Sequence, residues 1–188
     1  MANYEIFKAS IQSHEGGYQN IPTDWGNYNS KDELVGTNFG VSARFYERVI
    51  GRPPTQQDML NITQQEAHIL FKNEFWDKVL GDYIDSQEVA ETIADHAINS
   101  QPYKITKIVQ RVLNNEFGKN LKVDGLFGAK TLAAVNSVDY KKLFIEIGLA
   151  RKAYYESRPD FNHHGRSWLR RLRLLSEKFN IVIKKKVA

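Results

Sequence analysis

The residue of the sequence best suited to chemistry is Glu15, in the segment His14-Glu15-Gly16-Gly17-Tyr18. Apolar residues at spacings of three and four precede it, which predicts an amphipathic helix over residues 2–15. The two glycines would end this helix, so the Glu15 carboxyl would lie near the partial negative charge of a helix C-terminus. That setting and the nearby Tyr18 ring would raise the pKa of Glu15, which suits a general acid. The alternative is a solvated glutamate before a glycine stop.

The segment over residues 18–42 has no sustained periodicity and is rich in Asn, Gly, Asp, Ser and Pro. It is predicted to be a long functional loop or a short, irregular β-hairpin. Aromatic and polar side chains are mixed in it, as in a cleft for a polar ligand. These side chains belong to Tyr18, Asp24, Trp25, Tyr28, Thr37, Asn38 and Phe39.

Helices are expected to hold this loop in place. Ser42 is a predicted N-cap for a helix over residues 43–50, and Thr63 begins a capping box before a helix over residues 64–79. Helical periodicity predicts further helices over residues 87–99, 104–115, 139–157 and 166–180, and from Ala129 onward. The chain is therefore predicted to be mainly α.

Polar residues on the predicted helix 87–99 form a second candidate feature. Asp95 and Asn99 lie one turn apart on one face, with His96 beside them. Two alternatives are equally open, a solvated polar stripe and the wall of a cleft. Trp76, on the predicted helix 64–79, is expected in the core rather than in a ligand platform.

The composition indicates a globular protein with a basic surface. Its 188 residues suffice for one large domain or two small ones. The absence of cysteine excludes disulfides, thiol nucleophiles and zinc–thiolate sites. The net charge of +4, with basic residues concentrated in the last quarter, indicates a polyanionic partner such as nucleic acid, anionic lipid or bacterial cell wall.

The motifs of common nucleotide, dinucleotide, hydrolase and zincin sites are missing from the sequence. His163-His164 could contact a metal, but no set of three or four ligands occurs at metal spacing, so no metal or other cofactor is expected. No apolar run resembles a signal peptide or reaches the length of a membrane span. We therefore expect synthesis in the cytoplasm and no membrane insertion.

An ordered series of short motifs extends over residues 8–175. The motifs are Glu15-Gly16-Gly17-Tyr18, Asp24, Gly36-Thr37-Asn38-Phe39-Gly40-Val41-Ser42, Phe75-Trp76-Asp77, Asp95-His96-Ala97-Ile98-Asn99, Gln110-Arg111-Val112-Leu113-Asn114, Val123-Asp124-Gly125-Leu126-Phe127-Gly128-Ala129-Lys130-Thr131-Leu132, Arg151-Lys152-Ala153-Tyr154-Tyr155 and Gly165-Arg166-Ser167-Trp168-Leu169-Arg170-Arg171. This series resembles the glycoside hydrolase family 108 endolysins, some of which are labelled secretion activators. These are N-acetylmuramidases with a lysozyme-like fold and an accompanying predicted peptidoglycan-binding region.

The resemblance implies a mainly α, lysozyme-like fold with a short irregular β-hairpin or loop region near residues 18–42. It implies a catalytic region over residues 1–100, a helical peptidoglycan-binding region over residues 101–180 packed on it, and a basic tail over residues 181–188. The implied reaction is cleavage of the β-1,4 bond between N-acetylmuramic acid and N-acetylglucosamine in peptidoglycan. The protein would act in the periplasm or cell wall after holin-dependent release.

Glycosidic cleavage needs a carboxylic acid that protonates the leaving oxygen, and Glu15 is the expected acid. By analogy with phage-type lysozymes, Asp24 would be the base or electrostatic stabiliser, and Thr37 would position the attacking water, with inversion expected. The alternative for Asp24 is a turn-forming residue. Glycan binding needs flat apolar faces beside hydrogen-bonding groups. The candidates for it are Tyr18, Tyr28, Asn38 and Asn99.

The sequence departs from the family pattern in two places. In the family a Pro-Gly-Gly-x-Thr segment closely follows the aspartate, whereas residues 25–35 intervene here before Gly36-Thr37. This longer loop leaves the position of Asp24 relative to Thr37 open. The second departure is Ser100-Gln101, where the family often has glycine.

The sequence suggests two other classes of function. A longer loop that displaced Asp24 and Thr37 would give a non-catalytic peptidoglycan-binding or secretion-activating protein. A nucleic-acid binder is suggested by the Lys184-Lys185-Lys186 tail and the arginine-rich last helix. Leucines interleave with these arginines, which indicates a helix packed on a core, so no nucleic-acid partner is expected.

Overall fold

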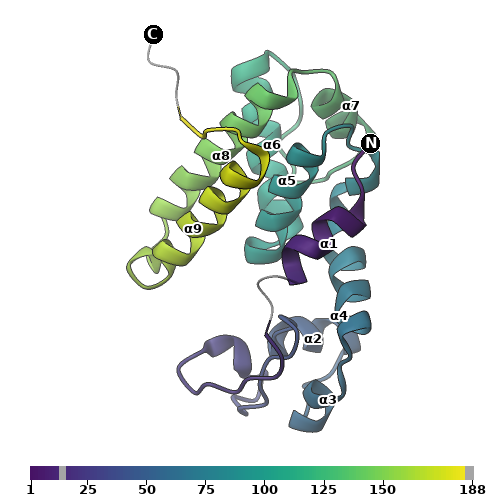
Figure 1. The fold of residues 1–188 in the computed structure, drawn as a ribbon, viewed down its shortest axis with the longest axis vertical. Helices are drawn as coiled ribbons and strands as arrows, with labels where there is room; N and C mark the ends of the chain where they lie inside the picture. The colour runs from purple at the N-terminus through teal and green to yellow at the C-terminus, as the bar shows by residue number, and fades with distance from the viewer. Residues whose placement is uncertain (13–15, 185–188) are drawn as a thin grey trace. The chain divides into compact units, whose positions relative to one another are not determined.

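The computed structural model describes residues 1–12 and 16–184, and these ranges are mainly helical, as predicted (Figure 1). The chain forms two compact units. We call Glu5–Lys72 the loop-rich unit, and Met1–Tyr4 with Asn73–Ala188 the helical unit. The segment from residue 73 onward clusters with the later helices, and the expected division after residue 100 into a catalytic and a peptidoglycan-binding region stays a prediction.

The loop-rich unit contains short helices and an irregular segment. Its helices are α1 (Tyr4–Gln12, whose first residue belongs to the helical unit), the 3-10 helix η1 (Trp25–Asn27), α2 (Ala43–Ile50), α3 (Gln56–Asn61) and α4 (Gln64–Phe71). Between residues 19 and 41 the described chain forms isolated antiparallel bridges, which join Gln19 to Thr37, Tyr28 to Leu34 and Asn38 to Val41. The alternative of a short, irregular β-hairpin is therefore not confirmed, and the described segment is an irregular loop with isolated bridges.

Local sequence signals set the ends of these helices. The Ser42 hydroxyl accepts a hydrogen bond from the Phe45 N–H and caps α2, which ends at Gly51 in the left-handed conformation, as predicted. Thr63 and Glu66 form the predicted capping box of α4. An equivalent box formed by Thr55 and Asp58 begins α3, a helix not predicted from the sequence.

The predicted helix over residues 64–79 is not continuous. After α4 the chain forms a π-helical turn (Lys72–Trp76) and a 3-10 turn (Asp77–Val79). The wider π turn allows the adjacent residues Phe75 and Trp76 to be buried together. Trp76 is a core residue, as expected, and its indole Nε1 donates to Asp82 Oδ1 at 2.7 Å.

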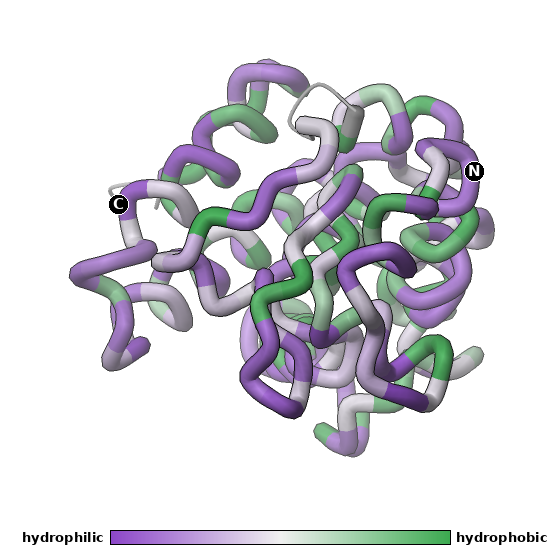
Figure 2. Tube along the Cα trace, turned by 90° about the horizontal axis from the view of Figure 1, so that it is seen from below, coloured by the Kyte–Doolittle hydropathy of each residue, from purple (hydrophilic) through white to green (hydrophobic). Residues whose placement is uncertain are grey.

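In its described residues, the helical unit is built from longer helices. They are α5 (Gln87–Ser100), α6 (Pro102–Phe117), α7 (Ala129–Asn136), α8 (Tyr140–Glu156) and α9 (Phe161–Phe179), after the 3-10 helix η4 (Gly81–Tyr83). Helix α5 packs against α6 and α8, and α8 packs against α9 (Figure 1). Hydrophobic and hydrophilic residues interchange along the chain (Figure 2), as expected of a protein whose helices each bury one face. Fully buried residues such as Ile93, Ile105 and Ile147 form the core between α5, α6 and α8.

Candidate active-site residues

The predicted general acid, Glu15, lies outside the described residues. Its role and its raised pKa therefore remain predictions. The other two predicted catalytic residues, Asp24 and Thr37, lie in the loop-rich unit, together with the predicted glycan-binding residues Tyr18 and Tyr28.

Asp24 is the N-cap of η1. Its Oδ1 accepts a hydrogen bond from the Gly26 N–H at 2.9 Å, and its Oδ2 accepts one from Nε2 of Gln19 at 3.2 Å. The turn-forming role considered for Asp24 is therefore present. The residue is also exposed, and its carboxylate has acceptor capacity beyond these two bonds.

Gln19, which was not among the residues predicted from the sequence, lies at the centre of this network. Its Oε1 accepts from Nδ2 of Asn27 at 2.8 Å and from the Ile21 N–H at 3.0 Å. Its Nε2 donates to Oδ1 of Asn27 at 2.9 Å as well as to Asp24. Both donors and both acceptor positions of the amide are thus used, which fixes the orientation of the side chain. No sequence signal identifies such a pair of amides in an aperiodic loop.

The long loop after Asp24 folds back on itself. The Asn27 carbonyl accepts hydrogen bonds from the N–H groups of Val35 and Gly36 at 2.9 and 3.0 Å. The side chain of Asn29 is fully buried and donates to the Pro54 carbonyl at 3.0 Å. The bonds from Val35 and Gly36 bring the chain back beside Asn27 immediately before Thr37.

Thr37 pairs directly with Gln19. The Gln19 N–H donates to the Thr37 carbonyl at 2.9 Å, and the Thr37 N–H donates to the Gln19 carbonyl at 2.8 Å. Directly opposed residues of an antiparallel pair direct their side chains to the same face. Thr37 and the Gln19–Asp24 contact are therefore on one face, although residues 25–35 lie between Asp24 and Gly36-Thr37 in the sequence.

Tyr18 packs on the backbone of Gly36. A Cβ atom at Gly36, whose φ is +90°, would lie 2.5 Å from Cε2 of the Tyr18 ring. The Tyr18 hydroxyl donates to the Val35 carbonyl at 3.1 Å and accepts from Nε2 of Gln56 at 3.0 Å. The half-buried ring is thus held in place, and its contact with a glycan remains a prediction.

Tyr28 and Asn38 are both held by bonds within the unit. The Tyr28 hydroxyl donates to the Pro22 carbonyl at 3.0 Å. Asn38 is only 4% exposed, and its amide donates to the carbonyls of Met59 and Ile62 at 3.0 and 3.2 Å, at the end of α3. Asn38 therefore ties the loop to α3, and glycan binding by either residue stays a prediction.

The polar residues of α5 lie in the helical unit. Asn99 is exposed and its Nδ2 donates to the Asp95 carbonyl of its own helix at 2.8 Å, so its predicted role in glycan binding also stays a prediction. Asp95 and His96 are buried, and a solvated polar stripe is therefore wrong for these two residues. They contact residues of α8 and α9, and the cleft-wall alternative stays a prediction.

Asp95 forms a buried ion-pair cluster with two arginines. Its Oδ2 is bonded to Arg151, and its Oδ1 accepts two bonds from Arg171, at 2.6 and 2.9 Å. Burial would raise the pKa of Asp95, but the charges of Arg171 and Arg151 outweigh it and lower the pKa below its usual value. Both oxygens of the carboxylate are thus bonded to arginines, and these bonds join α5 to α8 and α9.

His96 is fully buried beside this cluster. Burial, together with the Arg151 charge, lowers the pKa of His96 to about 2. Its Nδ1 lies 2.9 Å from the Tyr155 hydroxyl, which accepts a bond from Arg151. The hydroxyl proton can therefore be donated to Nδ1 of a neutral imidazole.

Two family models match the chain in sequence. The model described as Glycosyl hydrolase 108 matches residues 8–100, and the Predicted Peptidoglycan domain matches residues 104–172. Residues 8–100 therefore form a glycosyl hydrolase 108 region. Among solved structures it is similar to the structure of Brucella abortus SagA, with 26% identity and a TM-score of 0.79 over 98% of this chain and 100% of that chain. No curated protein matches it.

This likeness confirms the expected fold class, a mainly α, lysozyme-like protein. The glycosyl hydrolase 108 match contains all of the residues predicted to act in catalysis or glycan binding. Its last helix, α5, belongs to the same compact unit as the helices of the peptidoglycan domain. The family regions and the compact units therefore divide the chain at different places.

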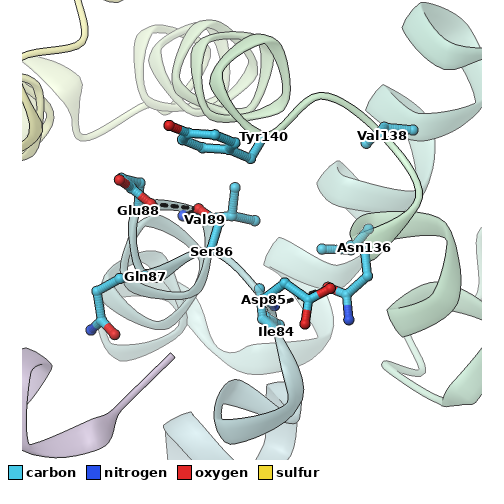
Figure 3. Close-up of a pocket in the computed structure, with 10 residues that line it drawn as sticks. Ile84, Asp85, Ser86, Gln87, Glu88, Val89, Asn136, Val138 and Tyr140 are labelled. Carbon is cyan, nitrogen blue, oxygen red and sulfur yellow. Dashed lines mark hydrogen bonds between the residues drawn. The ribbon is translucent and has the colours of Figure 1, made fainter. Parts of the chain in front are cut away.

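A pocket of about 330 Å³ lies in the helical unit (Figure 3). It is lined by residues just before and within the first turn of α5, including Asp85 and Glu88. Asn136, the last residue of α7, and Tyr140, the first residue of α8, also line it. In Figure 3, Glu88 is hydrogen-bonded to Ser86, and Asn136 to Asp85. None of the predicted site residues lines this pocket.

The described residues contain no group of three or more His, Asp and Glu side chains that could hold a metal ion. The expectation of metal-free chemistry stays a prediction. In residues 1–12 and 16–184, no helix is both long enough and apolar enough to cross a membrane.

Proposed function

We propose that this chain is a peptidoglycan hydrolase that cleaves the β-1,4 bond between N-acetylmuramic acid and N-acetylglucosamine. The two matched regions support this proposal, because one is a glycosyl hydrolase and the other a predicted peptidoglycan domain. Peptidoglycan is then both substrate and binding partner, and the site of action is the cell wall or periplasm.

The observation that carries a catalytic rather than a binding role is the connection of Asp24 and Thr37 through Gln19. A loop that moved these residues apart would favour a non-catalytic protein. Here the Gln19 backbone pairs with Thr37, and its side chain donates to Asp24. The longer loop is compatible with a base and a water-positioning hydroxyl on one face.

In the proposed reaction, Glu15 donates its proton to the glycosidic oxygen as the bond from that oxygen to the anomeric carbon breaks. Asp24 accepts a proton from a water molecule that attacks the anomeric carbon from the opposite face, and Thr37 orients this water. The product has inverted configuration. Such a mechanism requires a separation of about 6.5–9.5 Å between the two carboxyl groups, which leaves room for the water.

Digestion of purified peptidoglycan by the wild type and by Glu15→Gln tests the proposal. We expect new N-acetylmuramic acid reducing ends with the wild type and their loss with Glu15→Gln, because the amide cannot donate the proton. NMR of the first-formed anomer reports inversion. A retained anomer would contradict the inverting mechanism, and equal activity of Glu15→Gln would contradict the assignment of Glu15.

A second candidate function is non-catalytic binding of peptidoglycan. It is favoured by the use of both Asp24 oxygens in hydrogen bonds that hold the loop. Wild-type protein that binds several types of cell wall and releases no reducing ends from any of them would support this alternative.

A further inference from the structure

Trp25 is unusually exposed for a tryptophan. It is 80% exposed, and among the described large hydrophobic residues only the terminal Met1 is more so. Indole rings are normally buried for most of their surface, because a ring in water forgoes a large hydrophobic gain. A tryptophan held in water therefore requires an explanation.

The backbone around Trp25 is firmly held, so its exposure is not that of a loose loop tip. Asp24 caps the turn on one side through the Gly26 N–H, and the Tyr28 N–H donates to the Trp25 carbonyl at 3.3 Å. Below the turn, Asn27 is fully buried and joined to Gln19 by two amide hydrogen bonds. These hydrogen bonds therefore hold a rigid turn that presents the ring to solvent.

Tyr28 supports the Trp25 ring from within the same loop. The two ring centroids are 5.6 Å apart with an angle of 43° between the planes. The Tyr28 hydroxyl donates to the Pro22 carbonyl. The backbone carbonyl of Tyr28 accepts a hydrogen bond from Nε of Arg44 at 3.2 Å. Trp25 therefore has a fixed aromatic neighbour and presents most of its surface to solvent.

We propose that Trp25, supported by Tyr28, is a stacking site for an N-acetylated sugar ring of the glycan strand, next to Asp24. Sugar rings present C–H faces that pack on aromatic rings and hydroxyl groups that need polar neighbours. Exposed polar residues precede Trp25 in the chain, at Asn20, Thr23 and Asp24. The proposal rests on the proposed function only in taking peptidoglycan glycan as the ligand.

This site is a property of the longer loop. Trp25 and Tyr28 both belong to the segment that lies between Asp24 and Gly36-Thr37. The loop then adds contact with the glycan beside a residue proposed to react, and we expect it to increase affinity for longer strands.

Tryptophan fluorescence can test the site directly. The other two tryptophans are sheltered, since Trp76 is fully buried and Trp168 is half-buried and stacked on Tyr155 at 5.3 Å. In a Glu15→Gln background, titration with a hexamer of N-acetylglucosamine and with purified peptidoglycan strands should shift the emission to shorter wavelength. We expect Trp25→Ala to abolish this shift and to weaken binding, measured by calorimetry, roughly three- to tenfold. Trp25→Phe should retain part of the affinity.

Tyr83→Ala is the matched control, because Tyr83 is a 60% exposed aromatic residue of the helical unit. Its glycan affinity should equal that of the parent protein, and the thermal unfolding temperature of Trp25→Ala should be unchanged. Equal glycan affinity of Trp25→Ala and the parent would overturn the proposal. So would an emission shift with anionic lipid vesicles and none with either glycan.

The hydrolysis and the stacking site can fail separately. Wild-type protein that releases no reducing ends, yet binds glycan in a Trp25-dependent manner, contradicts the hydrolase and supports the stacking site. Active protein whose glycan affinity is independent of Trp25 contradicts only the stacking site.

Discussion

Gln19 and Thr37 face each other in an antiparallel bridge, in which the N–H of each donates to the carbonyl of the other. The side chain of Gln19 extends from this pair to Asp24 and Asn27. A single residue therefore connects both ends of the long loop through its backbone and its amide. This connection gives the first prediction.

Replacement of Gln19 by leucine removes the donor to Asp24 while preserving the size of the side chain. We expect kcat for peptidoglycan hydrolysis to fall roughly 10- to 100-fold. KM should change little, because the substitution removes a hydrogen bond that orients Asp24 and no contact with the substrate. The buried amide of Asn27 also loses its partner, so the free energy of unfolding should fall by about 1–3 kcal/mol.

The control is Gln57→Leu, since Gln57 is an exposed glutamine of the same unit that donates only to Asn61 in its own helix. It should leave kcat and stability near the wild-type values. Combination of Gln19→Leu with Asp24→Asn separates positioning from folding. If Gln19 acts through Asp24, the two losses in kcat will be far from additive. Fully additive losses would contradict this role.

Gly36 and Gly51 provide a matched pair for testing the packing of Tyr18. Both have positive φ, but a Cβ at Gly36 would meet the Tyr18 ring at 2.5 Å, whereas a Cβ at Gly51 meets nothing within 4 Å. We expect Gly51→Ala to lower the free energy of unfolding by about 1–2 kcal/mol, from backbone strain alone. Gly36→Ala should add about 1–3 kcal/mol for overpacking. Equal losses in urea denaturation would show that Tyr18 does not pack on Gly36.

The buried Arg151 should be among the most sensitive positions of the helical unit. Arg151→Met leaves the buried Asp95 with one arginine, and we expect the free energy of unfolding to fall by about 3–5 kcal/mol. The control is Arg173→Met, because Arg173 and its partner Glu177 are both exposed and 3.7 Å apart. Its effect should be below about 1 kcal/mol. Similar urea midpoints for the two variants would contradict the importance of the buried cluster.

His96 should make stability depend on pH. In the unfolded chain it binds a proton below about pH 6.5, but burial keeps it neutral in the folded protein, where its pKa is about 2. Between these values the unfolded state binds more protons, so this group lowers the free energy of unfolding as the pH falls. The slope is at most about 1.4 kcal/mol per pH unit.

Urea denaturation between pH 4.5 and 7.5 measures this slope. The range lies above the pH at which protonation of Asp95, whose pKa is lowered, also reduces the free energy of unfolding. We expect His96→Gln to flatten the slope and His164→Gln, which changes an exposed histidine of α9, to preserve it. A His96→Gln protein as sensitive to acid as the wild type would contradict the assignment.

The features that the sequence predicted well are local. The caps at Ser42, Gly51 and Thr63 depend on residues three or four positions apart, and the structure contains each of them. Helix α3 has the same kind of signal in Thr55 and Asp58. It was missed because it is only six residues long and follows two prolines.

The features that were missed depend on partners far apart in the sequence. Asp95 was open to interpretation because its partners lie 56 and 76 residues later, on α8 and α9. Gln19 contacts residues of an aperiodic loop, where no repeat marks which polar side chains turn inward. The end of α4 was also unpredictable, because apolar periodicity does not distinguish an α turn from a π turn.

Helix α5 has a consequence for the evolution of this family. The glycosyl hydrolase 108 match ends with α5, but the buried charges of that helix, Glu91 and Asp95, are neutralised by residues of α8 and α9. A recombination event between the two regions would deliver a helix whose carboxylates have lost their counter-charges. The two regions should therefore be inherited together rather than recombined independently. Substitutions on α5 should be accompanied by compensating substitutions on α8 and α9.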